Sequence, residues 1–221
     1  MNKFFVLLLS GVFLVACAST KPEPVSQDGL LLQNDTKFQE VYLLPGADLS
    51  TYQSIGLEAC SVSFRKNWLR DQNNSRLDLS SRVTQKDVDG IKDALGDACN
   101  DQFSKALLAT PAYDIVDQFD DGEAVLIVRP AIINLDINAP DTMSVGVTRS
   151  YTTTAGEMTL ALELVDGTTG QVLARARDRR RSPEYGTLQW TSGVTNKADA
   201  DRSLKRWAGI LRDGLDEATG R

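Results

Sequence analysis

The chain has 221 residues, of which 24 are Lys or Arg and 30 are Asp or Glu, so its formal net charge is −6. It contains no histidine, which excludes Ser-His-Asp and Cys-His catalysis and removes the commonest zinc ligand. An acidic chain is a poor partner for nucleic acid, whose phosphates need clustered basic side chains. We therefore expect one folded domain with no nucleic-acid partner, no metal site and no cofactor.

A short apolar segment opens the chain. Lys3 precedes an apolar run over residues 4–16, which has the length of a secretory signal peptide and is too short to cross a membrane. The run ends in Leu-Val-Ala-Cys at positions 14–17, which resembles the lipobox of bacterial lipoproteins. The pattern predicts removal of residues 1–16 and transfer of diacylglycerol to the thiol of Cys17. An ordinary secretory signal with a chance cysteine is the alternative.

Residues 17–29 contain two prolines, a glycine and polar side chains, which predicts a flexible tether. Ala18 directly follows the cysteine, where an Asp would retain a lipoprotein of enterobacteria at the inner membrane. We therefore expect an outer-membrane lipoprotein, anchored in the membrane by acyl chains such as palmitate on Cys17. Residues 30–221 then form a single globular domain in the periplasm, with display at the cell surface as the other possible orientation.

The first part of the domain predicts one strand and one helix. Residues 53–64 are typical of a strand, and residues 65–83 of a polar loop. A helix begins at Thr84, with Asp87 as a capping acid, and ends before Pro111. Its apolar face is formed by side chains at helical spacing: Val88, Ile91, Leu95, Cys99, Phe103 and Ala106.

The second part predicts further strands and a final helix. Residues 113–116, 124–128 and 133–137 are typical of strands, with Pro130 at a bulge or a sheet edge. Residues 197–218 carry one apolar stripe at helical spacing and predict a helix.

The clearest local signal is a β-hairpin with its turn at residues 166–170. Even-numbered apolar residues on its first arm alternate with polar or small ones, and the second arm alternates in the same way. A register that pairs Leu164 with Val172 and Leu160 with Ala176 places the apolar pairs on one side. The order of elements predicts an α+β fold, with an antiparallel or mixed β-sheet of four to six strands and two amphipathic helices packed on it.

Two cysteines remain after lipidation, Cys60 and Cys99. The cell envelope is oxidising, so an even pair predicts a disulfide. Cys60 lies on one face of the predicted strand, and Cys99 lies in the middle of the helix's apolar stripe. A helix packed on that strand would bring them together; two buried free thiols are the alternative.

Arg175, Arg177, Arg179 and Arg181 alternate along the second arm of the hairpin and therefore share one face. A row of guanidinium groups suits an anionic partner: a lipid phosphate, an acidic glycan or an acidic protein surface. The alternative is a solvated strand face, because the same register places Glu157 opposite Arg179 and neutralises part of the charge.

A second candidate site is the loop that contains Tyr42, Pro45, Gly46, Asp48 and Tyr52. Binding residues are often carried on loops, and the two tyrosines suit a functional loop. The same residues also suit a rigid turn, in which the Asp carboxylate caps backbone amides.

Several short blocks carry a resemblance to a known family. These blocks are Asp28-Gly29-Leu30, then Tyr42 with Pro45-Gly46-Ala47-Asp48-Leu49 and Tyr52, then Val62-Ser63-Phe64 with Asn67-Trp68. In them the chain resembles a family of bacterial lipoproteins called domain of unknown function 3313, over most of its length after the tether. The resemblance agrees with the lipoprotein prediction and implies no particular activity or binding residues.

The sequence shows no catalytic pattern, so the leading hypothesis is a non-enzymatic interaction or assembly module with an envelope protein or a glycan as its partner. The first alternative is a carrier of a lipid or another hydrophobic ligand, which predicts an apolar cavity between sheet and helices. The second is an enzyme that acts on glycans through two carboxylates, which would have to face each other across a cleft.

Overall fold

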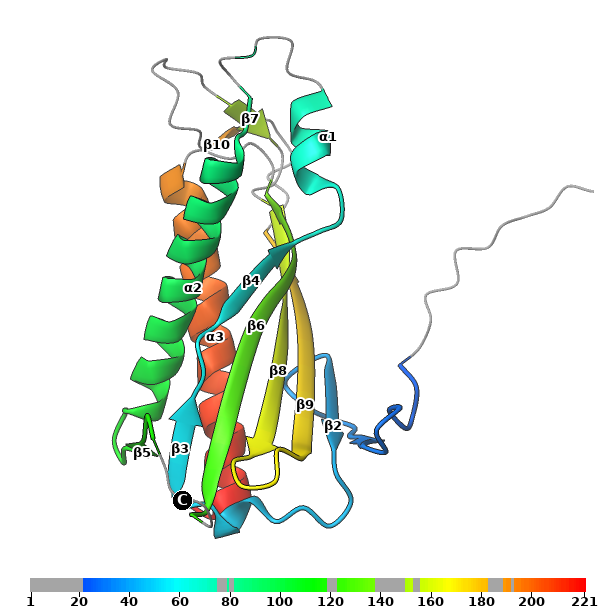
Figure 1. Ribbon diagram of the computed structural model, residues 1–221, viewed down its shortest axis with the longest axis vertical. Coiled ribbons are helices and arrows are strands. Elements are labelled where there is room, and N and C mark those ends of the chain that lie inside the picture. The colour runs from blue at the N-terminus through cyan, green and yellow to red at the C-terminus, as the bar shows by residue number, and fades with distance from the viewer. Residues whose placement is uncertain are drawn as a thin grey trace, which may run out of the picture.

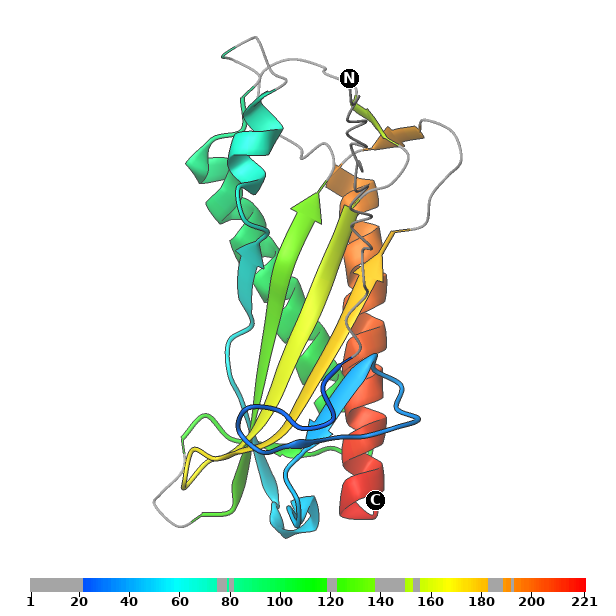
Figure 2. The same ribbon diagram turned by 90° about the vertical axis from the view of Figure 1, so that its right-hand side faces the viewer.

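A computed structural model describes residues 22–74, 79, 82–118, 123–137, 150–152, 156–182, 189–191 and 193–221. The predicted signal segment 1–16 and Cys17 lie outside these residues. Within them, no helix has both the length and the apolar character that a membrane crossing requires. Two long helices pack on one face of a mixed sheet (Figures 1 and 2).

The main sheet has eight strands: β1 (Leu31–Leu32), β2 (Glu40–Leu43), β3 (Ser54–Leu57), β4 (Ser61–Phe64), β5 (Asp114–Ile115), β6 (Val125–Ile137), β8 (Gly156–Asp166) and β9 (Val172–Arg181). A separate pair joins β7 (Ser150–Thr152) to β10 (Gln189–Thr191). The described helices are α1 (Trp68–Asn74), α2 (Gln85–Leu107) and α3 (Gly193–Thr219), with a 3-10 turn, η1 (Leu49–Thr51).

The α+β class agrees with the prediction, but the sheet is larger than the four to six strands expected. Its order is β1-β2-β9-β8-β6-β3-β5, and β4 also pairs with β6. Neither β1 nor β2 was expected, because strands of two and four residues are too short for an alternating pattern to reveal them. A third α-helix, α1, lies within residues 65–83, where the sequence predicts a loop.

Residues 53–64 form two strands rather than the single strand predicted. Both pair in parallel with β6, β3 along its first part and β4 farther along the same edge. Pro130 lies in the interval between them, opposite Leu162 of β8. β3 ends before Pro130 and β4 begins after it, so neither strand needs a hydrogen bond from the backbone N–H that proline lacks. A proline is therefore tolerated inside this long strand.

The hairpin of β8 and β9 forms, but in a register different from the predicted one. Leu164 lies opposite Ala174 rather than Val172, and Leu160 lies opposite Asp178. The register shifts between Leu164 and Val165, so the residue pairs beyond this point are displaced from the predicted ones. Alternation of apolar and polar residues does not reveal such a shift. The apolar residues of both arms still face the helices, because the shift is an even number of residues.

Helix α2 begins as predicted. The Thr84 side chain accepts a hydrogen bond from the backbone N–H of Asp87 at 3.2 Å, and the Asp87 carboxylate accepts one from the Thr84 N–H at 2.8 Å. This reciprocal capping satisfies two N–H groups that a helix start otherwise leaves without partners.

Cys60 and Cys99 are joined by the predicted disulfide, with their Cα atoms 6.1 Å apart. One turn earlier on α2, Gly96 is buried against the backbone of Cys60: a Cβ at position 96 would lie 3.1 Å from the Cys60 carbonyl oxygen. A glycine therefore allows the close approach of α2 to the start of β4, and the disulfide holds the helix there.

The C-terminal end of α2 is satisfied by a side chain from α3. Arg212 is 7% exposed. Its guanidinium donates to the carbonyl oxygens of Ala106, Leu107, Ala109 and Pro111, at 2.5–3.2 Å. The last carbonyl groups of a helix have no N–H partner within the helix, and Arg212 supplies donors to them. The same contacts link α3 to α2.

Candidate functional site

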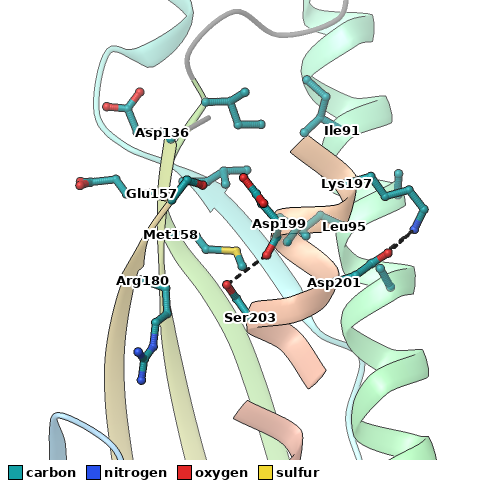
Figure 3. Close-up of a pocket in the computed structure, with 17 residues that line it drawn as sticks. Ile91, Leu95, Asp136, Glu157, Met158, Arg180, Lys197, Asp199, Asp201 and Ser203 are labelled. Carbon is teal, nitrogen blue, oxygen red and sulfur yellow. Dashed lines mark hydrogen bonds and ion pairs between the residues drawn. The ribbon is translucent and has the colours of Figure 1, made fainter. Parts of the chain in front are cut away.

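A cavity of about 370 Å³ lies between α2, α3 and the ends of β6, β8 and β9 nearest the start of α3 (Figure 3). Its apolar lining comes from all three kinds of element: Ile91, Ala94, Leu95 and Ala98 of α2, Leu135 and Ile137 of β6, Met158 of β8, and Ala200 of α3. Its position between the sheet and the helices is the one that the hydrophobic-carrier alternative predicts.

The cavity exists because the side chains on the inward face of α3 are smaller near the start of the helix than farther along it. Leu204, Trp207, Leu211 and Leu215 are buried and fill the space between the sheet and the helices farther along α3. Near the start of the helix, Ala200 takes the equivalent place on the inward face. A single Cβ cannot fill the volume that a leucine or tryptophan fills, so a space remains beside Met158.

Asp199 is the acid that projects from α3 into this space. Figure 3 shows its carboxylate directed from the helix toward the strands that carry Glu157 and Met158. The Asp199 side chain is only 10% exposed. One of its oxygens pairs with Arg202, whereas the other, Oδ2, is buried with no hydrogen-bond partner.

Two other acids in the lining, both on strands, point away from the helices. Figure 3 shows the carboxylates of Asp136 and Glu157 on the far side of the strands from α3. Asp136 pairs with Arg65 at 2.7 Å, and Glu157 pairs with Arg179. Each of these two acids therefore has an arginine partner, although Oδ1 of Asp136 is buried without a hydrogen-bond partner.

The basic side chains in the lining are also paired. Lys197 bonds to Asp201, one turn along α3, at 3.1 Å. Arg180 donates to the buried carboxylate of Asp178 at 2.7 Å. Among the charged lining residues that Figure 3 labels, Asp199 is therefore the one that directs its charge into the cavity.

The four predicted arginines lie on the outer face of the sheet, away from this cavity. Residues 174, 176 and 178 of β9 face the helices and are buried, so the alternate arginines face outward. Arg175 lies opposite Glu163 and Arg181 lies opposite Glu157, which corrects the predicted pairing of Glu157 with Arg179. Arg179 nevertheless reaches diagonally to the Glu157 carboxylate.

A continuous ion-pair network crosses this outer face. Asp28 pairs with Arg175 at 2.9 Å, and Arg175 pairs with Glu163 at 3.0 Å. Glu163 pairs in turn with Arg129 at 3.5 Å, and Arg129 pairs with Glu58 at 2.6 Å. Arg175 is therefore part of a neutralised strand face, and this arrangement favours the solvated-face alternative for it.

The residues of the candidate loop make contacts that hold the loop in a fixed conformation. The Asp48 carboxylate accepts from the Ser50 backbone N–H at 3.0 Å and caps η1. Gly46 has φ of +78°, a backbone conformation that glycine adopts without strain. Tyr52 donates to Asp166 in the hairpin turn, and burial together with that carboxylate raises the pKa of Tyr52 to about 12. These contacts favour the rigid-turn alternative.

Tyr42 holds the segment that the sequence predicts to be a flexible tether. Its hydroxyl donates to the Glu23 carbonyl oxygen at 3.0 Å. Five residues later, Asp28 pairs with Arg175 of β9. Residues 22–29 therefore lie against the edge of the sheet, because Tyr42 and Arg175 provide partners that composition alone does not reveal.

Sequence reasoning missed Asp199 and did not identify the residues that line the cavity. The available signal was weak: Asp199 precedes Ala200, one of the small residues on the apolar stripe of α3, and an acid beside such a stripe is usually solvated. Only the packing of α3 against the sheet turns this carboxylate inward.

Comparisons with known proteins place the chain in a family. The model of a protein family of unknown function, DUF3313, matches residues 25–211. No curated protein matches the chain. Among solved structures, the PelC dodecamer from Paraburkholderia phytofirmans is 12% identical over 78% of this chain and 96% of that one, with a TM-score of 0.38. Protein XCC0632 from Xanthomonas campestris is 12% identical over 73% of this chain and 82% of that one, with a TM-score of 0.41. The family match confirms the resemblance found in the sequence, and the chain belongs to the DUF3313 family.

Proposed function

We propose that this chain is a lipid-anchored protein of the bacterial envelope whose folded domain binds a small hydrophobic ligand in the cavity between α2, α3 and the sheet. The cavity is the observation that carries the proposal. Its volume of about 370 Å³ falls in the range of ligand sites, roughly 300–1,000 Å³. Among the described residues its lining is mainly aliphatic and includes the inward-directed carboxylate of Asp199, which is the usual composition of a small-molecule site.

The proposal gives the carrier alternative precedence over an interaction module. The interaction hypothesis rests on the lack of a catalytic pattern, whereas the carrier hypothesis predicts a specific cavity. The arginine row is the best candidate surface for an interaction module. Part of this row is held in ion pairs with Asp28, Glu157 and Glu163. This surface therefore offers less free charge to an anionic partner than the sequence suggests.

Binding without chemical conversion also agrees with the placement of the acids. A glycan hydrolase needs two carboxyl groups that flank the same bond, roughly 5–10 Å apart. Asp199 points into the cavity, but Asp136 and Glu157 point away from it and pair with arginines. This geometry supports a binding protein rather than a glycan-active enzyme.

A cavity-filling substitution tests the binding site. The mature chain with Cys17→Ser, exported so that its disulfide forms, is titrated with decanol and with an apolar fluorescent probe. Ala200→Leu, which fills the cavity, should weaken binding by about tenfold, the effect of roughly 1.4 kcal/mol. The control is Ala218→Leu, the same change at an exposed position near the end of α3. Equal affinities in the two variants would contradict the proposed site.

The anchor requires a separate experiment. Cys17→Ser should abolish incorporation of labelled fatty acid and leave either unprocessed precursor or released protein, because the thiol is the acceptor of the lipid. Ala18→Asp should keep the label but move the protein from the outer to the inner membrane. A Cys17→Ser protein that still fractionates with outer membranes at high salt would refute lipid anchoring.

A further inference from the structure

We infer that the ligand of this cavity carries a protonated amine beside its apolar chain, and that Asp199 binds the ammonium group. This inference rests on the proposed function and specifies the chemistry of the ligand. It begins with Oδ2 of Asp199, which is buried and lacks a hydrogen-bond partner. Buried carboxylate oxygens are nearly always hydrogen-bonded, so this acceptor calls for a donor that the ligand would supply.

The second observation is the direction of the two Asp199 oxygens. Oδ1 pairs with Arg202, whose side chain is 68% exposed, so that contact lies at the surface. Oδ2 is on the buried side of the same carboxylate, which Figure 3 shows directed into the cavity. The surface pair fixes the orientation of the side chain and leaves the inward oxygen available to a ligand.

The third observation is the balance of charge around the cavity. Lys197 is engaged by Asp201 and Arg180 by Asp178, so these two basic groups of the described lining are already paired. Asp199 pairs with Arg202 through Oδ1, whereas its inward Oδ2 has no hydrogen-bond donor among the described residues. The interior of the cavity is therefore complementary to a cation and unfavourable to an anion.

The apolar part of the site defines the rest of the ligand. Leu95, Met158 and Ala200 line the cavity together with Asp199 and carry no charge, so the ligand must place methylene groups against them. A single-chain amphiphile with an amine head matches both parts of the site. A fatty acid has the same chain, but it would bring its carboxylate next to Asp199.

Three ligands with the same chain separate these possibilities: decylamine, decanol and decanoic acid, each below its micellar concentration. Calorimetry on the mature chain should show that decylamine binds at least about tenfold more tightly than decanoic acid. Asp199→Asn keeps the shape of the side chain and removes its charge. It should lower the affinity for decylamine about tenfold and change the affinity for decanol by less, because a neutral hydroxyl group forms no ion pair with the carboxylate.

Asp213→Asn is the matched control, because it removes one acid from the exposed face of the same helix, where Asp213 pairs with Lys37. If both variants lose decylamine affinity equally, the amine responds to net charge alone and the inference is overturned. It is also overturned if Asp199→Asn has no effect or if decanoic acid binds most tightly. Decanol binding that Ala200→Leu weakens would still support the proposed cavity, so the two failures are distinguishable.

Discussion

The carboxylate of Asp178 accepts a hydrogen bond from the indole N–H of Trp207 at 2.7 Å, in the interior between β9 and α3. The Asp178 side chain is 1% exposed, and Trp207 is fully buried. The same carboxylate accepts from Arg180 Nε at 2.7 Å and from the backbone N–H of Gln39 at 3.2 Å. One buried acid therefore links α3, β9 and the segment that leads into β2.

We predict that Asp178→Ala lowers the free energy of unfolding by about 3 kcal/mol, because it leaves the Trp207 N–H and the Arg180 guanidinium without their buried acceptor. Chemical denaturation monitored by tryptophan fluorescence measures the change. Asp213→Ala, which breaks an exposed pair with Lys37, should cost less than about 1 kcal/mol. Similar losses in both variants would mean that the buried carboxylate has no special role.

Two glycines of α2 give opposite predictions for the same substitution. Gly90→Ala should raise the free energy of unfolding by up to about 1 kcal/mol, because a Cβ there meets nothing within 4 Å and alanine favours the helix. Gly96→Ala should lower it, because the new Cβ would lie 3.1 Å from the Cys60 carbonyl oxygen. That oxygen cannot move easily, since the disulfide holds Cys60. Thermal unfolding of both variants tests the pair; equal stabilisation would show that α2 shifts freely.

Removing the disulfide should destabilise the domain. Cys60 and Cys99 are 39 residues apart in the sequence, and closing a loop of this size stabilises a protein by about 4 kcal/mol in the chain-entropy model. The double variant Cys60→Ala/Cys99→Ala should therefore unfold at lower urea concentration than the wild type. Adding reductant should shift the wild type toward the variant and leave the variant unchanged. Alkylation of both thiols in the exported, unreduced protein would contradict the bond.

Contact of the N-terminal segment with the sheet should depend on pH through Asp28. Hydrogen bonds from Ser26 and from Arg175 lower the pKa of Asp28 from its ordinary 3.8 to about 2. A lowered carboxylate pKa contributes stability that is present above the unfolded pKa and is lost as pH falls through the folded value. The segment should therefore remain in place at about pH 4 and be released near pH 2.

Amide exchange at Leu32 measures this release, because its N–H donates to the Pro24 carbonyl oxygen at 3.0 Å. Asp28→Asn should speed this exchange at neutral pH, where the carboxylate is otherwise charged. Unchanged protection in the variant would show that Asp28 does not hold the segment in place.

The sequence by itself determines the features that depend on neighbouring residues. The capping pair Thr84 and Asp87 sets the start of α2, because their contact spans only one turn. Alternation sets which face of β8 and β9 is apolar, because side chains of a strand point to opposite faces in turn. An even pair of cysteines in an exported chain predicts the disulfide. The blocks around residues 28–68 reveal the family.

Tertiary structure decides the features that depend on partners far away in the sequence. The register of the hairpin follows from an irregularity at Leu164 and Val165, and the split of residues 53–64 follows from how β3 and β4 pair with β6. Short strands such as β1 and β2 gain their structure from pairing with the strands beside them. None of these relationships leaves a periodic trace in the chain.

The candidate site belongs entirely to the second group. Ala200 and Asp199 look like a small residue and a solvated acid on a helix, and nothing local distinguishes them from many others. Packing of α3 against the sheet places the alanine where a larger side chain would close the core. It also turns the neighbouring carboxylate into the space that remains. A cavity is the volume that several distant side chains fail to fill, so it exists only once the helices and the sheet have come together.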